Sequence, residues 1–178
     1  TNKTVTANKT ADPTFNANRV GIIKLSGVSS DTKYNVSVAG SAISEYTSPN
    51  DATYDTVLTE LKTRIEGLNL SITVTKLKDC LHLSRASSFT LTGTGGIYGT
   101  QLTVFQNSVP TLGDLPTESR NDHTVKIINS GALTSSYFLK FVATDGTSGP
   151  GYWTEALGHG MSTGLDASTM THQLRNSA

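Results

Sequence analysis

The chain is poor in cysteine, in excess charge of either sign and in long apolar runs. It has 178 residues and a single cysteine, Cys80, so no disulfide can form within it. Lysine and arginine number 14, as do aspartate and glutamate, whereas proteins that grip nucleic acid usually carry a clustered basic excess. No apolar run approaches the roughly 18 residues of a membrane-spanning helix. These absences exclude an internal disulfide scaffold, and they predict neither membrane insertion nor a surface that binds polyanions.

Serine and threonine are abundant instead, with 48 of the 178 residues. Threonine is β-branched and favours strands, so this bias predicts a β-rich chain with polar outward faces. At this length about 70% of the surface of the unfolded chain can be buried on folding. A hydrophobic core therefore needs no covalent staple.

Two segments near the start predict a β-hairpin. Residues 20–25 are apolar nearly throughout, as in a strand that is covered on both faces. Residues 33–38 alternate, with Tyr34, Val36 and Val38 on one face and polar side chains on the other. The serines and glycine between them favour a turn, so we expect the two strands to pair.

After these strands the spacing of apolar residues changes from two to that of a helix. After a cluster of capping residues, apolar side chains recur at spacings of three and four residues: Tyr54, Val57, Leu58, Leu61, Ile65 and Leu68. This pattern predicts an amphipathic helix over residues 52–67. Alternation then predicts a second hairpin from residues 71–75 and 80–84, and further strands over residues 89–91, 102–105, 125–128 and 137–142.

These elements predict an α+β, mostly β fold, with one helix and antiparallel sheets of about six to eight strands. We expect an extended lead-in over residues 1–19 and a β-rich domain over residues 20–156. Residues 157–178 are predicted to be an irregular segment that leads to an interface or to a following domain. The glycines at 93, 95 and 96 predict a plain turn, because no lysine or helix follows them to bind a phosphate.

The candidate catalytic residues are two acids beside an aromatic pair. Asp145 and Glu155 flank Tyr152 and Trp153, and two carboxylates near a tryptophan are typical of sugar-cleaving clefts. However, Asp145 precedes Gly146 in a turn signal, where its side chain bonds its own backbone. We expect Glu155 at a strand edge, with Trp153 pointing the other way into the core. We therefore predict no enzyme, and keep carbohydrate binding or polysaccharide hydrolysis as the alternative function.

Other chemistry-bearing residues predict no site. None of the histidines has metal-ligand spacing to another histidine or to the cysteine, so we expect no metal and no cofactor. Cys80 is expected to be a buried or incidental thiol. Four Asn-x-Ser/Thr triplets leave a secreted, adhesin-like β domain as a third hypothesis, although such triplets arise by chance in a chain so rich in serine and threonine. They begin at Asn2, Asn8, Asn35 and Asn69.

Three blocks in the last quarter of the chain follow a known pattern. They are Tyr137-Phe138-Leu139-Lys140-Phe141, Gly151-Tyr152-Trp153-Thr154-Glu155 and Ser168-Thr169-Met170-Thr171-His172-Gln173-Leu174-Arg175. They resemble the segments Tyr-Tyr-Val-Lys-Phe, Gly-x-Trp-x-Glu and Thr-Met-Pro-His-x-Leu-Val-Arg of the tail tubular protein B, or nozzle protein, family of short-tailed bacteriophages (podoviruses). Thr171 stands where the family usually has proline, and Leu174-Arg175 lacks the intervening residue. The family-motif positions are Tyr137, Lys140, Trp153, Glu155, Thr169, Met170, His172 and Arg175.

The resemblance extends upstream over almost the whole chain, and it implies a structural role. Family chains are several times longer, so this sequence resembles an N-terminal domain fragment of a tail-tube subunit. The resemblance implies a homo-oligomeric ring, hexameric in the full-length protein, with other phage tail proteins as partners. It places the protein in the virion tail, and in the host cytoplasm during assembly. DNA would pass through the ring without sequence-specific binding, and the balanced charge agrees, since a conduit should not grip phosphate.

Overall fold

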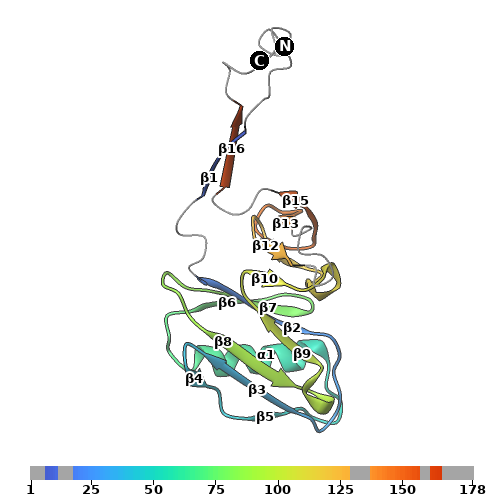
Figure 1. Ribbon diagram of the computed structural model, residues 1–178. Helices are drawn as coiled ribbons and strands as arrows, with labels where there is room; N and C mark the ends of the chain where they lie inside the picture. The colour runs from blue at the N-terminus through green and yellow to red at the C-terminus, as the bar shows by residue number, and fades with distance from the viewer. Residues whose placement is uncertain (1–6, 12–17, 129–136, 157–160, 166–178) are drawn as a thin grey trace, which may run out of the picture.

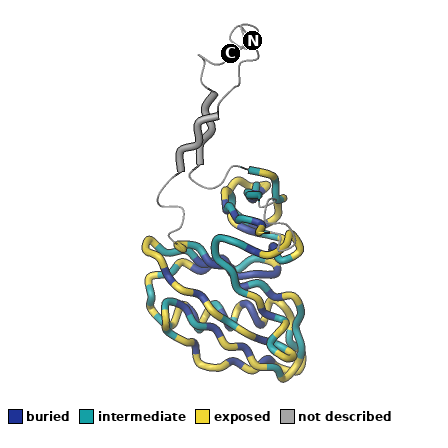
Figure 2. The backbone as a smooth tube through the Cα atoms, in the orientation of Figure 1, coloured by how far each residue is buried: buried dark blue, intermediate teal, exposed yellow. Residues whose placement is uncertain are grey.

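Antiparallel β-sheets make up most of the structure, a computed structural model that describes residues 7–11, 18–128, 137–156 and 161–165. Figure 1 shows a body of sheets from which a two-stranded ribbon projects. Within the described residues there is one α-helix, so the predicted α+β, mostly β fold is confirmed. Figure 2 shows buried residues inside the body, and buried and exposed residues alternate along strands such as the one over residues 33–38.

Two sheets and the helix enclose the first hydrophobic cluster. One sheet has the strand order β6-β7-β2-β9, and the other is built on β3, which pairs with β4, β5 and β8. The strands are β2 (Val20–Leu25), β3 (Lys33–Val38), β4 (Ser41–Ala42), β5 (Tyr46–Thr47), β6 (Thr73–Lys76), β7 (Cys80–Ser84), β8 (Leu91–Gly95) and β9 (Leu102–Phe105). A short 3₁₀ helix, η1 (Ile97–Gly99), connects β8 to β9.

The predicted pairing of β2 with β3 is wrong, because the two strands lie in different sheets. Both edges of β2 are occupied, by β7 on one side and β9 on the other. The backbone N–H of Leu25 donates to Asp79 O at 2.9 Å and that of Ser26 to Gln101 O at 3.0 Å. The chain therefore leaves β2 with its bonds already satisfied and crosses to the other sheet. The second predicted hairpin is confirmed, since β6 and β7 pair antiparallel.

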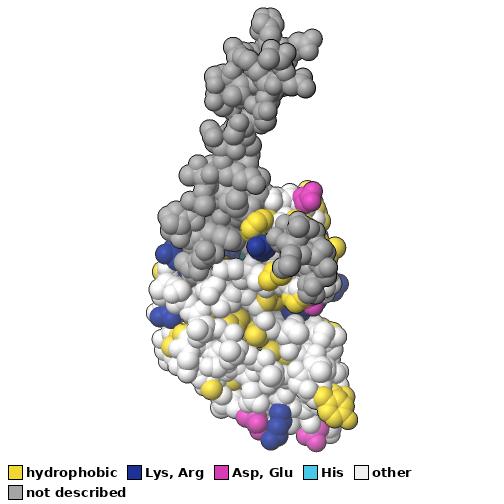
Figure 3. Space-filling model, in the orientation of Figure 1, with side chains coloured by type: hydrophobic (Ala, Val, Ile, Leu, Met, Phe, Trp, Pro, Cys, Tyr) yellow, Lys and Arg dark blue, Asp and Glu magenta, His cyan; other side chains and the backbone are white. Residues whose placement is uncertain are grey.

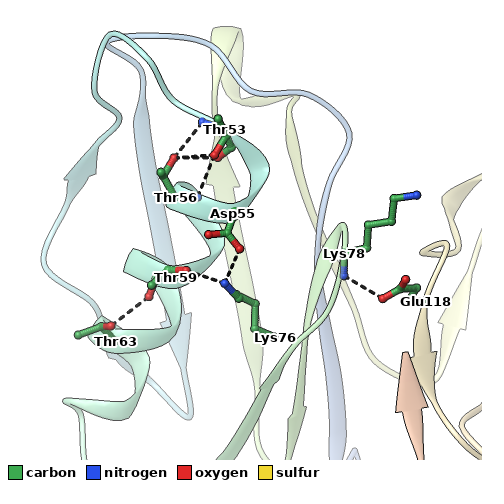
Figure 4. Close-up of polar contacts among 8 residues, drawn as sticks. All are labelled: Thr53, Asp55, Thr56, Thr59, Thr63, Lys76, Lys78 and Glu118. Atoms are coloured by element: carbon green, nitrogen blue, oxygen red, sulfur yellow. Dashed lines mark hydrogen bonds and ion pairs between the residues drawn. The ribbon is translucent and has the colours of Figure 1, made fainter. Parts of the chain in front are cut away.

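Helix α1 (Tyr54–Glu66) begins and ends close to the predicted limits of residues 52 and 67. Thr53 caps it: its side chain accepts from the N–H of Thr56, and the Thr56 hydroxyl accepts from the N–H of Thr53 (Figure 4). Four of the six apolar side chains that predicted the helix are buried, and they pack into the first cluster with residues of both sheets. Of the other two, Tyr54 is 36% exposed, and Leu68 lies beyond the end of the helix and is partly buried against the cluster. Lys76 on β6 pairs with Asp55 in the first turn, which ties the helix to the sheet (Figure 4).

The glycines at 93 and 95 lie inside strand β8, which corrects the predicted turn. A Cβ on Gly95 would lie 2.2 Å from a ring carbon of Tyr34, its cross-strand partner on β3. Glycine is therefore required where the buried tyrosine ring crosses the neighbouring strand. Only Gly96 turns the chain, with φ at +77°.

A second group of strands encloses a smaller hydrophobic cluster. Its main sheet has the order β10-β12-β13-β15, in which β10 and β12 are parallel, and β11 pairs with β14 beside it. The elements are β10 (Ser108–Val109), η2 (Leu112–Asp114), β11 (Ser119–Arg120), β12 (Thr124–Ile127), β13 (Tyr137–Ala143), β14 (Ser148–Gly149) and β15 (Gly151–Ala156). The buried residues of this second cluster are Val109, Leu115, Val125, Ile127 and Leu139.

The ribbon joins the two ends of the described chain. Strand β1 (Ala7–Ala11) pairs antiparallel with β16 (Met161–Leu165), in a register that places Ala7 opposite Leu165 (Figure 1). Five residues of the stretch that we expected to be irregular, 157–178, therefore form a strand. The sequence pattern is silent here because strand pairing depends on a partner that is distant in the chain.

We expect Gly95→Ala to destabilise the fold by about 1–3 kcal/mol, because the added methyl group must displace the buried ring of Tyr34. Urea unfolding followed by circular dichroism measures this change. The matched control is Gly113→Ala, where the nearest heavy atom to a new Cβ is 3.7 Å away and the free energy of unfolding should change by less than about 0.5 kcal/mol. Equal stability of the two variants would contradict the role of Gly95.

Candidate functional site around Trp153

Trp153 lies on β15 and packs against the second hydrophobic cluster. Its indole N–H donates to Pro116 O at 2.9 Å. Its ring meets the ring of Phe141, the cross-strand partner, at a centroid distance of 5.2 Å, and that of His123 at 5.7 Å. A tryptophan with its apolar body packed and its one donor satisfied acts as an anchor. Trp153 thus closes the cluster and ties β15 to the segment that carries η2.

The other family-motif positions have simpler surroundings. Tyr137 packs against the second cluster, at the start of β13. Lys140 pairs with Asp122 at 3.1 Å, and because both side chains are exposed this pair adds little stability. Thr169, Met170, His172 and Arg175 lie outside the described residues.

The carboxylate of Asp145 accepts hydrogen bonds within its own turn. The backbone N–H groups of Thr147 and Ser148 donate to one carboxylate oxygen at 2.8 and 3.0 Å, and the Thr147 hydroxyl donates to the other at 2.7 Å. These bonds hold the pKa of Asp145 below its ordinary value, with the Thr147 hydroxyl contributing most. A general acid needs a raised pKa, so Asp145 is poorly suited to that role.

Glu155 lies on the same face of β15 as Trp153, which corrects the expectation that the two point to opposite sides. Residues two apart in a strand share a face, and the register places Glu155 opposite Leu139. Asp145 lies in the turn beyond Gly151, whereas Glu155 is about 13 Å further along the strand from that glycine. Paired glycosidase carboxylates lie about 5–9.5 Å apart. The geometry therefore lends no support to a sugar-cleaving cleft at these acids.

Strand β7 forms the junction between the two clusters, and sequence reasoning missed it. Leu81 and Leu83 lie in the first cluster. Cys80 and His82, on the opposite face, are equally buried. The Cys80 thiol donates to Glu118 O at 3.5 Å, and the ring of His82 packs edge-on against that of His123 at 5.0 Å. The second group of strands covers this face, and Cys80 is buried, one of the two outcomes that the sequence predicted for its thiol.

Polar groups tether the loops at this junction. The buried carboxylate of Asp79 accepts from the N–H of Thr117 at 2.9 Å. The N–H of Lys78 donates to a carboxylate oxygen of Glu118 at 3.2 Å (Figure 4). Lys24 donates to Gly113 O at 2.8 Å. Each bond joins the first group of strands to the segment that carries η2 and β11.

Two buried titratable groups, Cys80 and His82, are held in their neutral forms. Burial raises the pKa of the Cys80 thiol, and the charges of Asp79 and Glu118 raise it further, so this cysteine is unsuited to act as a nucleophile. Burial, with the positive charge of Arg120, lowers the pKa of His82 to about 4. Among the described residues no three histidine, cysteine or acidic side chains gather as a metal site.

We expect Trp153→Ala to destabilise the protein by about 3 kcal/mol, because it opens the second cluster and leaves the carbonyl of Pro116 without this donor. Urea unfolding followed by circular dichroism gives the change. The control is Tyr152→Ala, since Tyr152 is the neighbouring aromatic residue and is 63% exposed. If the two variants lose the same stability, Trp153 is not an anchor.

His82 should make stability depend on pH. The unfolded chain protonates this histidine as pH falls below about 6.5, whereas the folded chain resists until about 4, so its contribution is present above pH 6.5 and is lost as pH falls towards 4. The contribution is on the order of 3 kcal/mol. Urea unfolding at several pH values should show a smaller loss on acidification for His82→Leu than for the unaltered chain. An equal loss in both proteins would rule out His82 as the cause.

No helix among the described residues is long and apolar enough to cross a membrane. A search of curated proteins found no match to the chain. A protein-family model described as bacteriophage nozzle protein matches residues 1–178, the whole chain. This match agrees with the resemblance carried by the Trp153 and Glu155 block. The chain belongs to the bacteriophage nozzle protein family.

Proposed function

We propose that this chain is a domain of a ring-forming nozzle subunit that surrounds the path of DNA during ejection. The observation that carries the proposal is the family match over residues 1–178. Membership of this family makes the chain a structural component of a phage tail and locates it in the virion tail. The ring, its six-fold order and the DNA conduit are the proposed part, as is residence in the host cytoplasm during assembly.

The charge distribution suits a conduit. Opposite charges pair across the described surface instead of gathering by sign; the pairs are Lys33–Glu45, Lys62–Glu66, Arg64–Glu60, Lys76–Asp55 and Lys140–Asp122. Affinity for DNA grows with the number of phosphates that free lysines and arginines neutralise. Five lysines and arginines are paired in this way, which leaves fewer free cations to hold the phosphates of passing DNA.

The ribbon suits an assembly. Among the described residues, β1 and β16 each have the other as their one ladder partner. A two-stranded ribbon is marginally stable alone, and its outer edges present backbone groups that can pair with another strand. In a ring each subunit uses two different patches, one for each neighbour. We infer that other copies and other tail proteins complete such surfaces.

A structural role also agrees with the chemistry of the candidate site. Trp153 is packed, Asp145 is bound to its own turn, and Glu155 is at the other end of the hairpin. The cysteine is buried with a raised pKa. The described residues thus supply anchors, and we propose no catalytic step.

The full-length protein that carries this domain should form rings. Sedimentation velocity over a range of concentrations is expected to show a species of about six subunits, and negative-stain images should show a central opening. The physical reason is that two different patches on each subunit close a ring when the rotation between neighbours is a sixth of a turn. A full-length protein that stays monomeric at every concentration would falsify the proposal.

A further inference from the structure

Tyr98 stands almost fully in solvent on a short loop, residues 96–99, which we name the tip. The side chain of Tyr98 is 97% exposed and that of Ile97 is 45% exposed. Tyr98 has φ at 54°, a left-handed conformation that costs a residue with a side chain about 1–2 kcal/mol. Gly96 and Gly99 on either side also have positive φ. The fold therefore holds an exposed aromatic ring in a strained backbone without burying it in return.

Hydrogen bonds hold the tip in one shape. The N–H of Ile97 donates to the side-chain oxygen of Gln101 at 3.2 Å, and the amide nitrogen of Gln101 donates to the Ser29 hydroxyl at 2.8 Å. The Thr100 hydroxyl donates to Ile97 O at 2.9 Å. Strain that surrounding bonds maintain is common where a backbone presents a side chain to a ligand. The ring of Tyr98 is thus presented from a fixed loop.

An open hollow lies between the tip and the outward face of β3 and β8. Lys33, Asn35 and Thr94 line it together with the tip. A second hollow continues along the same two strands past Ser37 and Thr92. The register places Asn35 opposite Thr94 and Ser37 opposite Thr92, so amide and hydroxyl groups form two neighbouring rows. A polar, shallow track therefore runs along the strands and ends at an aromatic ring.

The track has no free charge among these groups. The ammonium group of Lys33 pairs with Glu45 at 2.9 Å. Figure 1 shows α1 behind β3 and β8, so the view is onto their outward face. Figure 3 shows that this face carries mainly uncharged polar groups, with charged side chains gathered at its lower end. An anionic ligand would find no unpaired cation here.

We propose that this track binds a neutral oligosaccharide. A pyranose ring has an apolar C–H face, which packs on the exposed ring of Tyr98, and a rim of hydroxyls, which Asn35 and Thr94 can bind by donating and accepting. Phosphate or acidic sugars call for charge-assisted bonds to free lysine or arginine. A stable protein partner needs a wider apolar centre than one tyrosine and one isoleucine supply. This site goes beyond the structural function, and it is separate from Trp153, Asp145 and Glu155.

The test is a titration of the ¹⁵N-labelled chain with a panel of neutral oligosaccharides: cellohexaose, maltohexaose and chitohexaose. At least one should shift the backbone amide signals of Gly95, Gly96 and Gly99. Tyr98→Ala should weaken that binding about tenfold or more, the effect of losing about 1.4 kcal/mol of ring contact. Tyr98→Phe, which keeps the ring, should retain most of the affinity. Because Tyr98 is exposed and strained, neither variant should lose stability in urea.

Tyr152→Ala is the matched control, since it removes another exposed tyrosine on a different sheet and should leave the affinity unchanged. Hexagalacturonate, an anionic oligosaccharide, should bind at least about tenfold more weakly than the best neutral sugar. The proposal fails if no neutral sugar in the panel shifts these signals at millimolar concentration, or if Tyr152→Ala weakens binding as much as Tyr98→Ala. It also fails if Tyr98→Ala leaves sugar binding intact and instead lowers the sedimentation coefficient, which would make the tip a contact between copies.

Discussion

The burial of strand β7 on both faces is the constraint on which the rest of the structure depends. Its leucines hold the first cluster together beneath α1, while Cys80 and His82 face the second group of strands. A buried polar group costs free energy unless it is paired or kept neutral. The Cys80 thiol has a carbonyl partner, whereas His82 is neutral and packs edge-on against His123 with its Nδ1 atom buried and without a hydrogen-bond partner among the described residues. Separating the two clusters would expose this face of β7 and break the bonds that Asp79 and Lys78 make across the junction.

Local periodicity made the helix and most strands predictable, and non-local pairing made the rest unpredictable. The spacing of apolar residues in α1 predicts one buried face, and the four buried residues of the helix lie on that face. The alternation of β7 places Leu81 and Leu83 on one face, but it does not show that a second layer covers the face that carries Cys80 and His82. The partner of β2 could not be read from its own residues, since its neighbours β7 and β9 come from later in the chain. The sequence predicts a turn at Gly95 because it does not show that the ring of Tyr34 packs against this glycine from the neighbouring strand.

The candidate site also has features that local sequence predicts and features that it does not. The turn of Asp145 was predictable, because an Asp-Gly pair binds its own backbone whatever surrounds it. The face of Glu155 followed from the period of two and was assigned wrongly. The partner of the Trp153 indole, Pro116, lies 37 residues away and left no signal in the sequence. The family was recognisable from short blocks, whereas the proposed ring and its opening would be formed by several copies and leave no pattern in one chain.

The ribbon and the tip lie at different ends of the body. Strands β1 and β16 bring the entering and leaving segments together in one ribbon, and Figure 1 places that ribbon at the opposite end of the body from the connection between β8 and β9. The tip therefore lies towards the end of the body away from this ribbon. Its backbone is fixed by Gln101 and Thr100, so it presents Tyr98 without a folding step on binding. A ligand that meets it needs to order little beyond itself, which raises the affinity of the small contact that one ring makes. Identical copies in the proposed ring would add such contacts together.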